Sequence, residues 1–200
     1  MNIFVPKYLT FGADIKHIHF SDKKVIKSFK INHSFYKTIQ FYDYISENDS
    51  DLFPILYSKN EDKLLIETEN CGNLLSLFDL PNDWIYQINK LRSFFQKNNI
   101  LILDIRFMPH TPYVINNLCL KNNKIYLVDL ALYETATNQM INTYFDNFIY
   151  EVKVRHKLKN NLLIFPVHFI LEIKRLLCDL FRKIKNNLYH VYSYFIPSFR

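Results

Sequence analysis

The hydrophobic pattern of the chain changes character near residue 70, and this change limits the possible folds more than any single motif. Before that point, short runs alternate apolar and polar residues with the period of two that is typical of β-strands. The predicted elements are three short strands within 7–29, a helix over 33–45 and two strands over 52–57 and 63–68. The order β-β-β-α-β-β predicts a small β-rich unit over residues 1–70.

After residue 70 the apolar residues mostly recur with helical spacing. Between Trp84 and Phe95 they return every three to four positions, which indicates one amphipathic helix. The Asn-Asn pair in the sequence KNNK favours a type I′ turn between two strands. The predicted elements are a helix over 82–98, a short strand over 100–103, a hairpin of 118–120 and 125–128, and helices within 137–188. The whole chain is therefore predicted to be α+β, with a second, largely helical unit over 71–200.

Composition supports a compact protein that works in a reducing compartment. The 200 residues are 49% hydrophobic and 22% charged, which is enough apolar material for a sizeable core. Cys71, Cys119 and Cys178 are odd in number and have no zinc-ligand spacing, so a disulfide framework is not expected. The N-terminus shows no secretory signal pattern and no apolar run is long enough to span a bilayer. A cytoplasmic location follows from these features.

One carboxylate calls for a specific explanation. In NKIYLVDLALYE, Asp129 directly follows a strand of apolar residues and precedes more of them. An acid in such a place is costly to desolvate unless it is paired, accepts hydrogen bonds or holds a metal ion. Either a metal site or a carboxylate that accepts backbone N–H bonds at a strand end would satisfy Asp129.

The order of elements resembles that of the protein-kinase-like superfamily, over roughly residues 7–135. A strand ending in Val-Asp, Ile-Leu-Asp after a long helix, and Asn before a hairpin are similar to three motifs of that family. The resemblance implies a two-lobed fold with a small β-rich N-lobe and a shortened helical C-lobe. It is closest in kind to compact bacterial or viral kinase-like proteins, such as small sugar kinases and lipopolysaccharide-core kinases.

The resemblance also implies a nucleotide and metal site. Asp129 stands where the family has its Mg²⁺-binding acid, and Asn117 or Asn116 stands where it has the second metal ligand. Lys27, in Val-Ile-Lys, is similar to the lysine that holds the nucleotide phosphates, and Gly12 is the one glycine retained in the phosphate-covering loop. The implied cofactors are ATP and Mg²⁺.

Asp104 takes the place of the family's catalytic acid, which orients the hydroxyl of the acceptor. The usual His-Arg before it is absent, and the loop between Asp104 and Asn117 is longer than in the family. A structural carboxylate that pairs with Arg106 is the alternative for Asp104. The partner helix has Thr38 where the family has a glutamate. These departures favour a second hypothesis, a catalytically inactive pseudokinase that serves as a binding or scaffold module.

Basic charge gathers at the C-terminus. The last fifty residues hold ten of the 25 Lys and Arg but only three of the 19 Asp and Glu. An amphipathic helix over 162–188 is expected to pack its apolar stripe on the second lobe and to leave its basic residues in solvent. The stripe comprises Phe169, Ile170, Ile173, Leu177, Leu180 and Ile184. Peripheral contact of the basic face with an anionic membrane is a further expectation, whereas nucleic acid is not an expected partner, because no aromatic stacking platform is recognisable.

Overall fold

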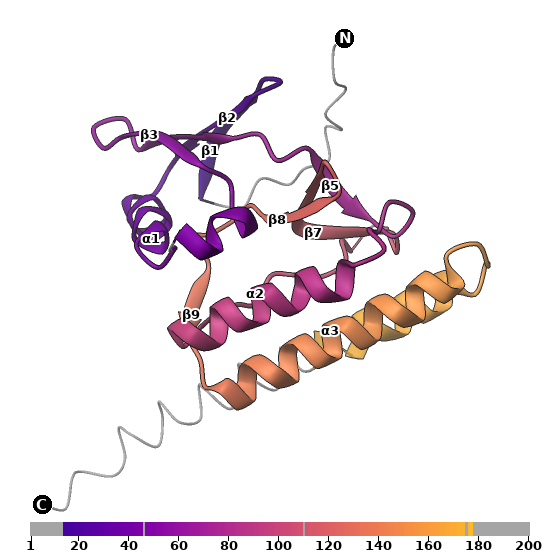
Figure 1. The fold of residues 1–200 in the computed structure, drawn as a ribbon. Coiled ribbons are helices and arrows are strands. Elements are labelled where there is room, and N and C mark those ends of the chain that lie inside the picture. The colour runs from indigo at the N-terminus through magenta and orange to yellow at the C-terminus, as the bar shows by residue number, and fades with distance from the viewer. Residues whose placement is uncertain (1–13, 46, 110, 175, 178–200) are drawn as a thin grey trace, which may run out of the picture.

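The N-terminal part of the chain is an antiparallel four-stranded sheet. The structure of the protein is a computed structural model that describes residues 14–45, 47–109, 111–174 and 176–177 (Figure 1). The strand order is β1-β2-β4-β3, formed by β1 (Ile15–Phe20), β2 (Lys24–Phe29), β3 (Leu56–Asn60) and β4 (Leu65–Glu69). Two of the three strands predicted within 7–29 are confirmed, and the first of the three lies outside the described residues.

Helix α1 (Asn32–Tyr42) joins this sheet to the rest of the protein. Phe35 packs edge-on against Phe29 of β2, with ring centroids 5.8 Å apart. Two turns later, Phe41 packs against Phe94 of the next long helix, with ring centroids 5.7 Å apart. Both side chains are fully buried. The helical spacing of these aromatic residues therefore links the small core under the sheet to the large core.

The predicted strand over 52–57 is largely wrong. Leu52 ends a 3₁₀ helix, η1 (Glu47–Leu52), and β3 begins only at Leu56. Leu52 and Phe53 are buried, but they belong to the large core cluster and not to the sheet. Burial of a short apolar run fits a turn as well as a strand, and periodicity does not separate the two.

The second part of the chain combines helices with two small sheets. Strands β5 (Asn73–Ser76), β7 (Val114–Lys121) and β8 (Lys124–Leu127) form one sheet, and β6 (Ile100–Ile102) pairs with β9 (Tyr133–Thr135). Helices α2 (Trp84–Asn98) and α3 (Asn138–Leu158) run side by side (Figure 1). Phe95 and Phe145 meet between them, with ring centroids 5.8 Å apart. The protein is mixed α+β, as predicted.

The hairpin between β7 and β8 confirms the turn predicted from Asn-Asn. Asn122 has φ 50° and Asn123 has φ 64°. A type I′ turn requires positive φ at both central residues, and asparagine tolerates that conformation better than other non-glycine residues. The turn fixes the register in which Leu118 lies opposite Leu127.

The helix after α3 presents a different face to the core from the one predicted. Residues 164–174 are helical, and their buried side chains are Ile164 and His168. The described members of the predicted stripe are exposed: Phe169, Ile170, Ile173 and Leu177. Leu180 and Ile184 lie outside the described residues. In the part of the chain that the structure describes, no helix is long and apolar enough to cross a membrane.

The reason for this rotation is a buried charge that the sequence pattern does not reveal. Arg155 on α3 is 0% exposed and forms an ion pair with Glu151, with Nη2 2.5 Å from Oε1. From the following helix, His168 Nδ1 contacts Arg155 Nη1, and a Glu172 oxygen lies 4.0 Å from Nη2. A buried guanidinium requires polar partners, so the helix must turn His168 and Glu172 inward.

Replacing Gly72 by alanine is expected to destabilise the protein. Gly72 joins β4 to β5 with φ 84°, a conformation that costs a side-chain-bearing residue about 1–3 kcal/mol. An added Cβ would also lie 2.3 Å from the backbone oxygen of Leu120. Urea unfolding should show the loss, while the neighbouring exposed Asn73→Ala should change the free energy of unfolding by less than about 0.5 kcal/mol. Equal stability of the two variants would contradict a requirement for glycine at position 72.

Candidate active site

Lys27 and Asp129 come from distant parts of the sequence and lie close together. Lys27 is on β2, and its Nζ donates a hydrogen bond to the backbone oxygen of Val128, 3.0 Å away. Val128 immediately precedes Asp129, at the end of β8. The contact spans 101 positions of the sequence and connects the N-terminal sheet with the second part of the chain. Two residues chosen from separate motifs are thus brought to one place.

The carboxylate of Asp129 is half-buried. It makes no hydrogen bond and no ion pair with the residues that the structure describes. The expectation that backbone N–H groups at the strand end would satisfy it is therefore not met within those residues.

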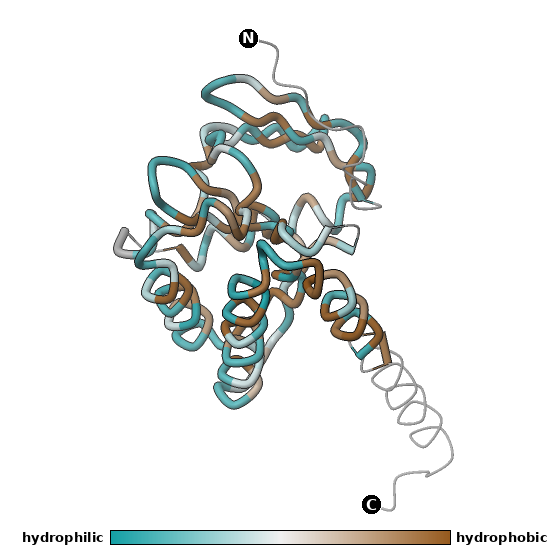
Figure 2. Tube along the Cα trace, turned by 90° about the vertical axis from the view of Figure 1, so that its right-hand side faces the viewer, coloured by the Kyte–Doolittle hydropathy of each residue, from teal (hydrophilic) through white to brown (hydrophobic). Residues whose placement is uncertain are grey.

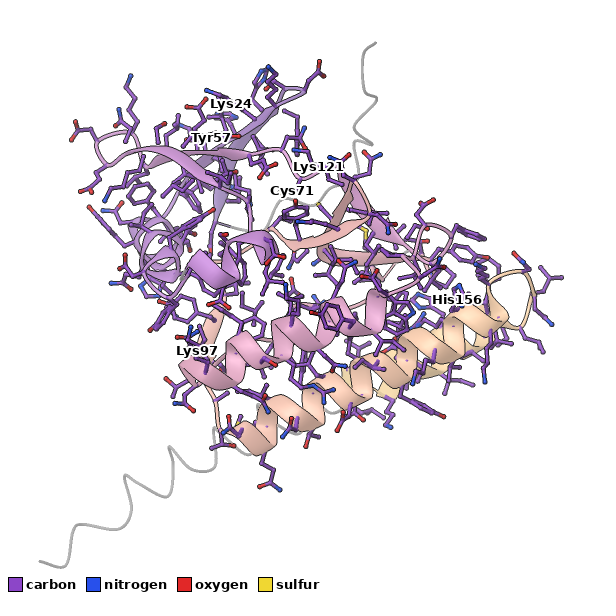
Figure 3. The ribbon with its side chains drawn as sticks, in the orientation of Figure 1. Lys24, Tyr57, Cys71, Lys97, Lys121 and His156 are labelled. Atoms are coloured by element: carbon purple, nitrogen blue, oxygen red, sulfur yellow. The ribbon has the colours of Figure 1, made fainter. Side chains whose placement is uncertain are left out.

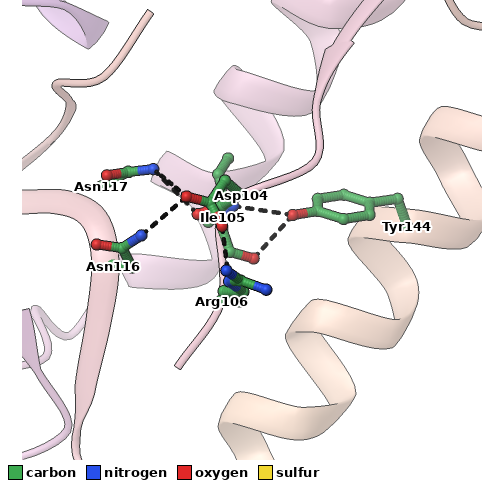
Figure 4. A network of polar contacts seen from close by, with 6 residues as sticks. All are labelled: Asp104, Ile105, Arg106, Asn116, Asn117 and Tyr144. Atoms are coloured by element: carbon green, nitrogen blue, oxygen red, sulfur yellow. Dashed lines mark hydrogen bonds and ion pairs between the residues drawn. The ribbon is translucent and has the colours of Figure 1, made fainter. Parts of the chain in front are cut away.

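Asp104 is the centre of a polar network just after β6 (Figure 4). Its Oδ2 accepts hydrogen bonds from Asn116 Nδ2, at 3.0 Å, and from Asn117 Nδ2, at 3.1 Å. Its Oδ1 pairs with Arg106 Nε at 2.6 Å. The structure thus brings together three sequence-predicted site residues, together with the arginine partner expected if Asp104 is structural. Both oxygens of Asp104 have partners, and the guanidinium balances its charge.

Asn117 connects this network to the strand that carries Asp129. Its backbone is left-handed, with φ 61°. Its side-chain nitrogen faces Asp104, and its backbone oxygen accepts a hydrogen bond from Val128 N at 3.0 Å. The backbone N–H of Asn116 donates instead to the backbone oxygen of Arg106, 2.6 Å away. Asn117 is therefore tied to both Asp104 and the residue before Asp129, whereas Asn116 is tied only to the Asp104 loop.

Tyr144 supports the network from α3, and the sequence pattern gave no sign of this role. Its hydroxyl donates to the backbone oxygen of Ile105 at 2.8 Å and accepts from Ile105 N at 3.0 Å. Burial raises the pKa of the Tyr144 phenol well above its usual range, so the hydroxyl keeps its proton and remains a donor. The residue after Asp104 is thus fixed from a separate helix. A tyrosine that faces the core from an amphipathic helix is too common a signal to predict such a contact.

Two other predicted elements of a nucleotide site do not contribute to this cluster in the described part of the chain. Gly12 is outside the described residues. Thr38 occupies the helix position where the resemblance places a glutamate, and its hydroxyl donates to Ser34 O of the same helix at 2.8 Å. Thr38 therefore does not hold Lys27. Among the residues that the structure describes, no group of three His, Cys, Asp or Glu side chains is arranged to hold a metal ion.

Two thiols border the site on the β5–β7 side. Cys71 and Cys119 are both buried and both unoxidised (Figure 3 labels Cys71). Desolvation by burial raises the pKa of each thiol to about 12. The thiolate is the nucleophilic form of cysteine, so neither thiol is activated for chemistry at neutral pH. Beside Cys71, Lys121 Nζ pairs with Glu69 Oε1 at 2.6 Å, which accounts for both of those charges.

Comparison with known proteins gives no relative from which a function could be transferred. No protein-family model matches the chain, and no curated protein matches it either.

Proposed function

We propose that this protein is a divergent, two-lobed kinase-like phosphotransferase that uses ATP and Mg²⁺ and acts on a hydroxyl acceptor. The observation that carries the proposal is the hydrogen bond from Lys27 Nζ to Val128 O, 3.0 Å long. It supports a site in which an ammonium group and the Asp129 carboxylate face the same nucleotide phosphates, as the chemistry of phosphoryl transfer requires. A reducing cytoplasm is the proposed location, with which Cys71 and Cys119, outside any disulfide, are compatible.

The residues present fit a magnesium ion of the kind that nucleotides carry. Mg²⁺ prefers oxygen ligands, keeps several waters, and uses one or two carboxylates together with substrate phosphates. Asp129 would supply the carboxylate. Asn117 turns its amide nitrogen to Asp104, so its side-chain oxygen is the atom that could face the cation. Bound Mg²⁺ would neutralise the charge that develops on the transferred phosphoryl group.

The remaining roles follow from the charges of the side chains. Lys27 would hold the phosphates, because its ammonium is a compact charge on a long stem. Asp104 would orient the acceptor hydroxyl by accepting its hydrogen bond. Because Arg106 balances the charge of Asp104 at 2.6 Å, the carboxylate is better suited to orientation than to removing a proton. A loose phosphoryl-transfer transition state needs positioning more than a strong base.

A pseudokinase that binds without turnover remains the second candidate. Specific contacts favour it: Thr38 is bonded within its own helix, and both oxygens of Asp104 are engaged by Arg106 and the asparagines. Such a protein would keep the fold and present a surface to a partner. Nucleotide binding alone would not separate the two candidates, but turnover would.

Consumption of the ATP γ-phosphate tests the proposal, with water serving as a poor acceptor in the absence of the natural one. Wild-type protein should release phosphate in an Mg²⁺-dependent manner. Asp104→Asn should lower the rate about 100-fold or more, because misplacing the attacking oxygen by about 1 Å costs that much. Asp62→Asn, at an exposed turn, is the matched control and should leave the rate unchanged. ATP binding without any turnover by the wild type would favour the pseudokinase.

A further inference from the structure

The helical residues 164–174 and 176–177 turn an apolar face away from the rest of the protein. The largest exposures belong to Leu162 at 83%, Phe169 at 66% and Ile170 at 63%. We call this surface the outward face; its described members are Leu162, Leu163, Phe165, Phe169, Ile170, Ile173, Leu176 and Leu177. In Figure 2 this segment is a helix at the edge of the molecule, and most of it has the brown colour of hydrophobic residues. Large apolar side chains scattered singly on a surface are ordinary, but eight within sixteen residues are a patch.

The orientation of this face is fixed by the polar contacts behind it. His168 contacts Arg155 through Nδ1, and its Nε2 lies 3.2 Å from Pro109 O. The Arg155 guanidinium also stacks over the Phe107 ring, 4.2 Å from its centroid. Turning the outward face inward would break both His168 contacts and take one polar partner away from the buried Arg155 charge. The helix therefore cannot rotate to hide its apolar residues.

Aromatic rings and a lysine extend the outward face across neighbouring segments. The Phe165 ring lies 6.1 Å from that of Tyr113, which lies 5.1 Å from that of Phe78. Lys159 Nζ sits 5.8 Å above the Phe78 ring and 3.0 Å from His156 Nε2 (Figure 3 labels His156). Burial, together with the Lys159 charge, lowers the pKa of His156, which favours the neutral imidazole at pH 7.

Basic side chains are exposed on the helix that carries the outward face and on α3, the helix before it. Lys174 is exposed on the former and Lys153 and Lys157 on the latter, while Glu151 and Glu172 lie beside Arg155. The sequence of 178–200 adds four basic residues and one acidic residue. A helix with an apolar face, aromatic residues and flanking lysines is typical of segments that lie in a membrane interface.

We propose that the outward face binds the surface of an anionic lipid bilayer, with its apolar side chains in the interface and its lysines at the lipid headgroups. A second copy of the chain is a poorer occupant, because a symmetric contact would set the same cationic surfaces against each other. The chain's own residues 178–200 would add more positive charge and not balance it. This proposal does not depend on the phosphotransferase activity.

Vesicle co-sedimentation of the full chain tests the proposal. Wild-type protein should bind vesicles of phosphatidylcholine with phosphatidylglycerol, bind pure phosphatidylcholine much less, and be released by raised salt. Phe169→Asp should weaken the partition into anionic vesicles about tenfold or more, because a large apolar side chain is lost from the interface. Lys174→Gln should weaken it less, by about fivefold, in keeping with the loss of one charge at the lipid surface.

The matched control is Ile55→Asp, at another exposed apolar residue, just before β3. It should bind anionic vesicles as the wild type does, and all variants should keep the wild-type melting temperature. Three results would overturn the proposal: negligible binding of the wild type to anionic vesicles, equal loss of binding in Ile55→Asp, or a lipid-free dimer that Phe169→Asp converts to a monomer. Binding of single-stranded DNA in place of vesicles would overturn it as well.

Discussion

Replacing Arg155 by methionine is expected to lower the free energy of unfolding by about 3–5 kcal/mol, the largest stability change we predict for a single substitution. The guanidinium is 0% exposed and lies among Glu151, Glu172 and His168. Methionine fills much of the same volume but removes the cation that balances the Glu151 carboxylate, 2.5 Å away. The packing over Phe107 would also lose its cation, 4.2 Å above the ring.

Urea unfolding followed by circular dichroism measures this change. Lys153→Met is the matched control, because it makes the same exchange of charge for thioether at an exposed site of α3. It should change stability by less than about 0.5 kcal/mol. A second variant, with Glu151→Leu added to Arg155→Met, should recover part of the loss, since the half-buried Glu151 carboxylate would no longer lack a counter-charge. If Arg155→Met were as stable as Lys153→Met, the account of how the last helix is oriented would be wrong.

Replacing Asp129 by asparagine is expected to reduce Mg²⁺-dependent consumption of ATP by about 100-fold or more. The amide keeps the size of the side chain but removes the negative charge that holds the cation. Stability should hardly change, because the Asp129 carboxylate makes no hydrogen bond or ion pair with the described residues and is only half-buried. A loss of activity with an unchanged melting temperature is therefore the specific signature.

Glu134→Gln is the control for Asp129→Asn. Glu134 lies five positions further along, on β9, and its side chain is exposed. The variant loses one carboxylate near the same strand end without touching the proposed metal ligand, and should keep wild-type activity. An equal loss in both variants would point to a general electrostatic effect and would contradict a specific role for Asp129.

Elements with strong local signals were predicted well from the sequence. The helix expected over 82–98 is α2, which begins at Trp84 and ends at Asn98. The turn at Asn122 and Asn123 has the expected positive φ values. In these cases the signal is local: an apolar stripe for the helix, and a conformational preference of asparagine for the turn.

The errors occur where a distant partner decides the outcome. No periodicity indicates that Arg155 is buried, yet its charge turns the following helix so that His168 faces inward and Phe169 outward. The candidate site is similar. The sequence indicated Asp104 and the two asparagines, but not that one carboxylate oxygen accepts from both. Tyr144 contacts Ile105 from α3, and the position of that helix depends on the whole fold and not on a local signal.

Thermal unfolding with ATP, in the presence and absence of Mg²⁺, tests the central claim most directly, namely that Lys27 and Asp129 face one bound nucleotide. A ligand that binds only the native state at about 100 times its Kd adds about 2.7 kcal/mol of stability. For a chain of this length that corresponds to a rise in Tm of about 5–10 °C. We expect such a rise with ATP and Mg²⁺ together, a smaller rise with ATP alone, and no effect of Mg²⁺ on Asp129→Asn. An unchanged Tm at millimolar ATP and Mg²⁺, or a rise that Asp129→Asn retains in full, would contradict the proposed site.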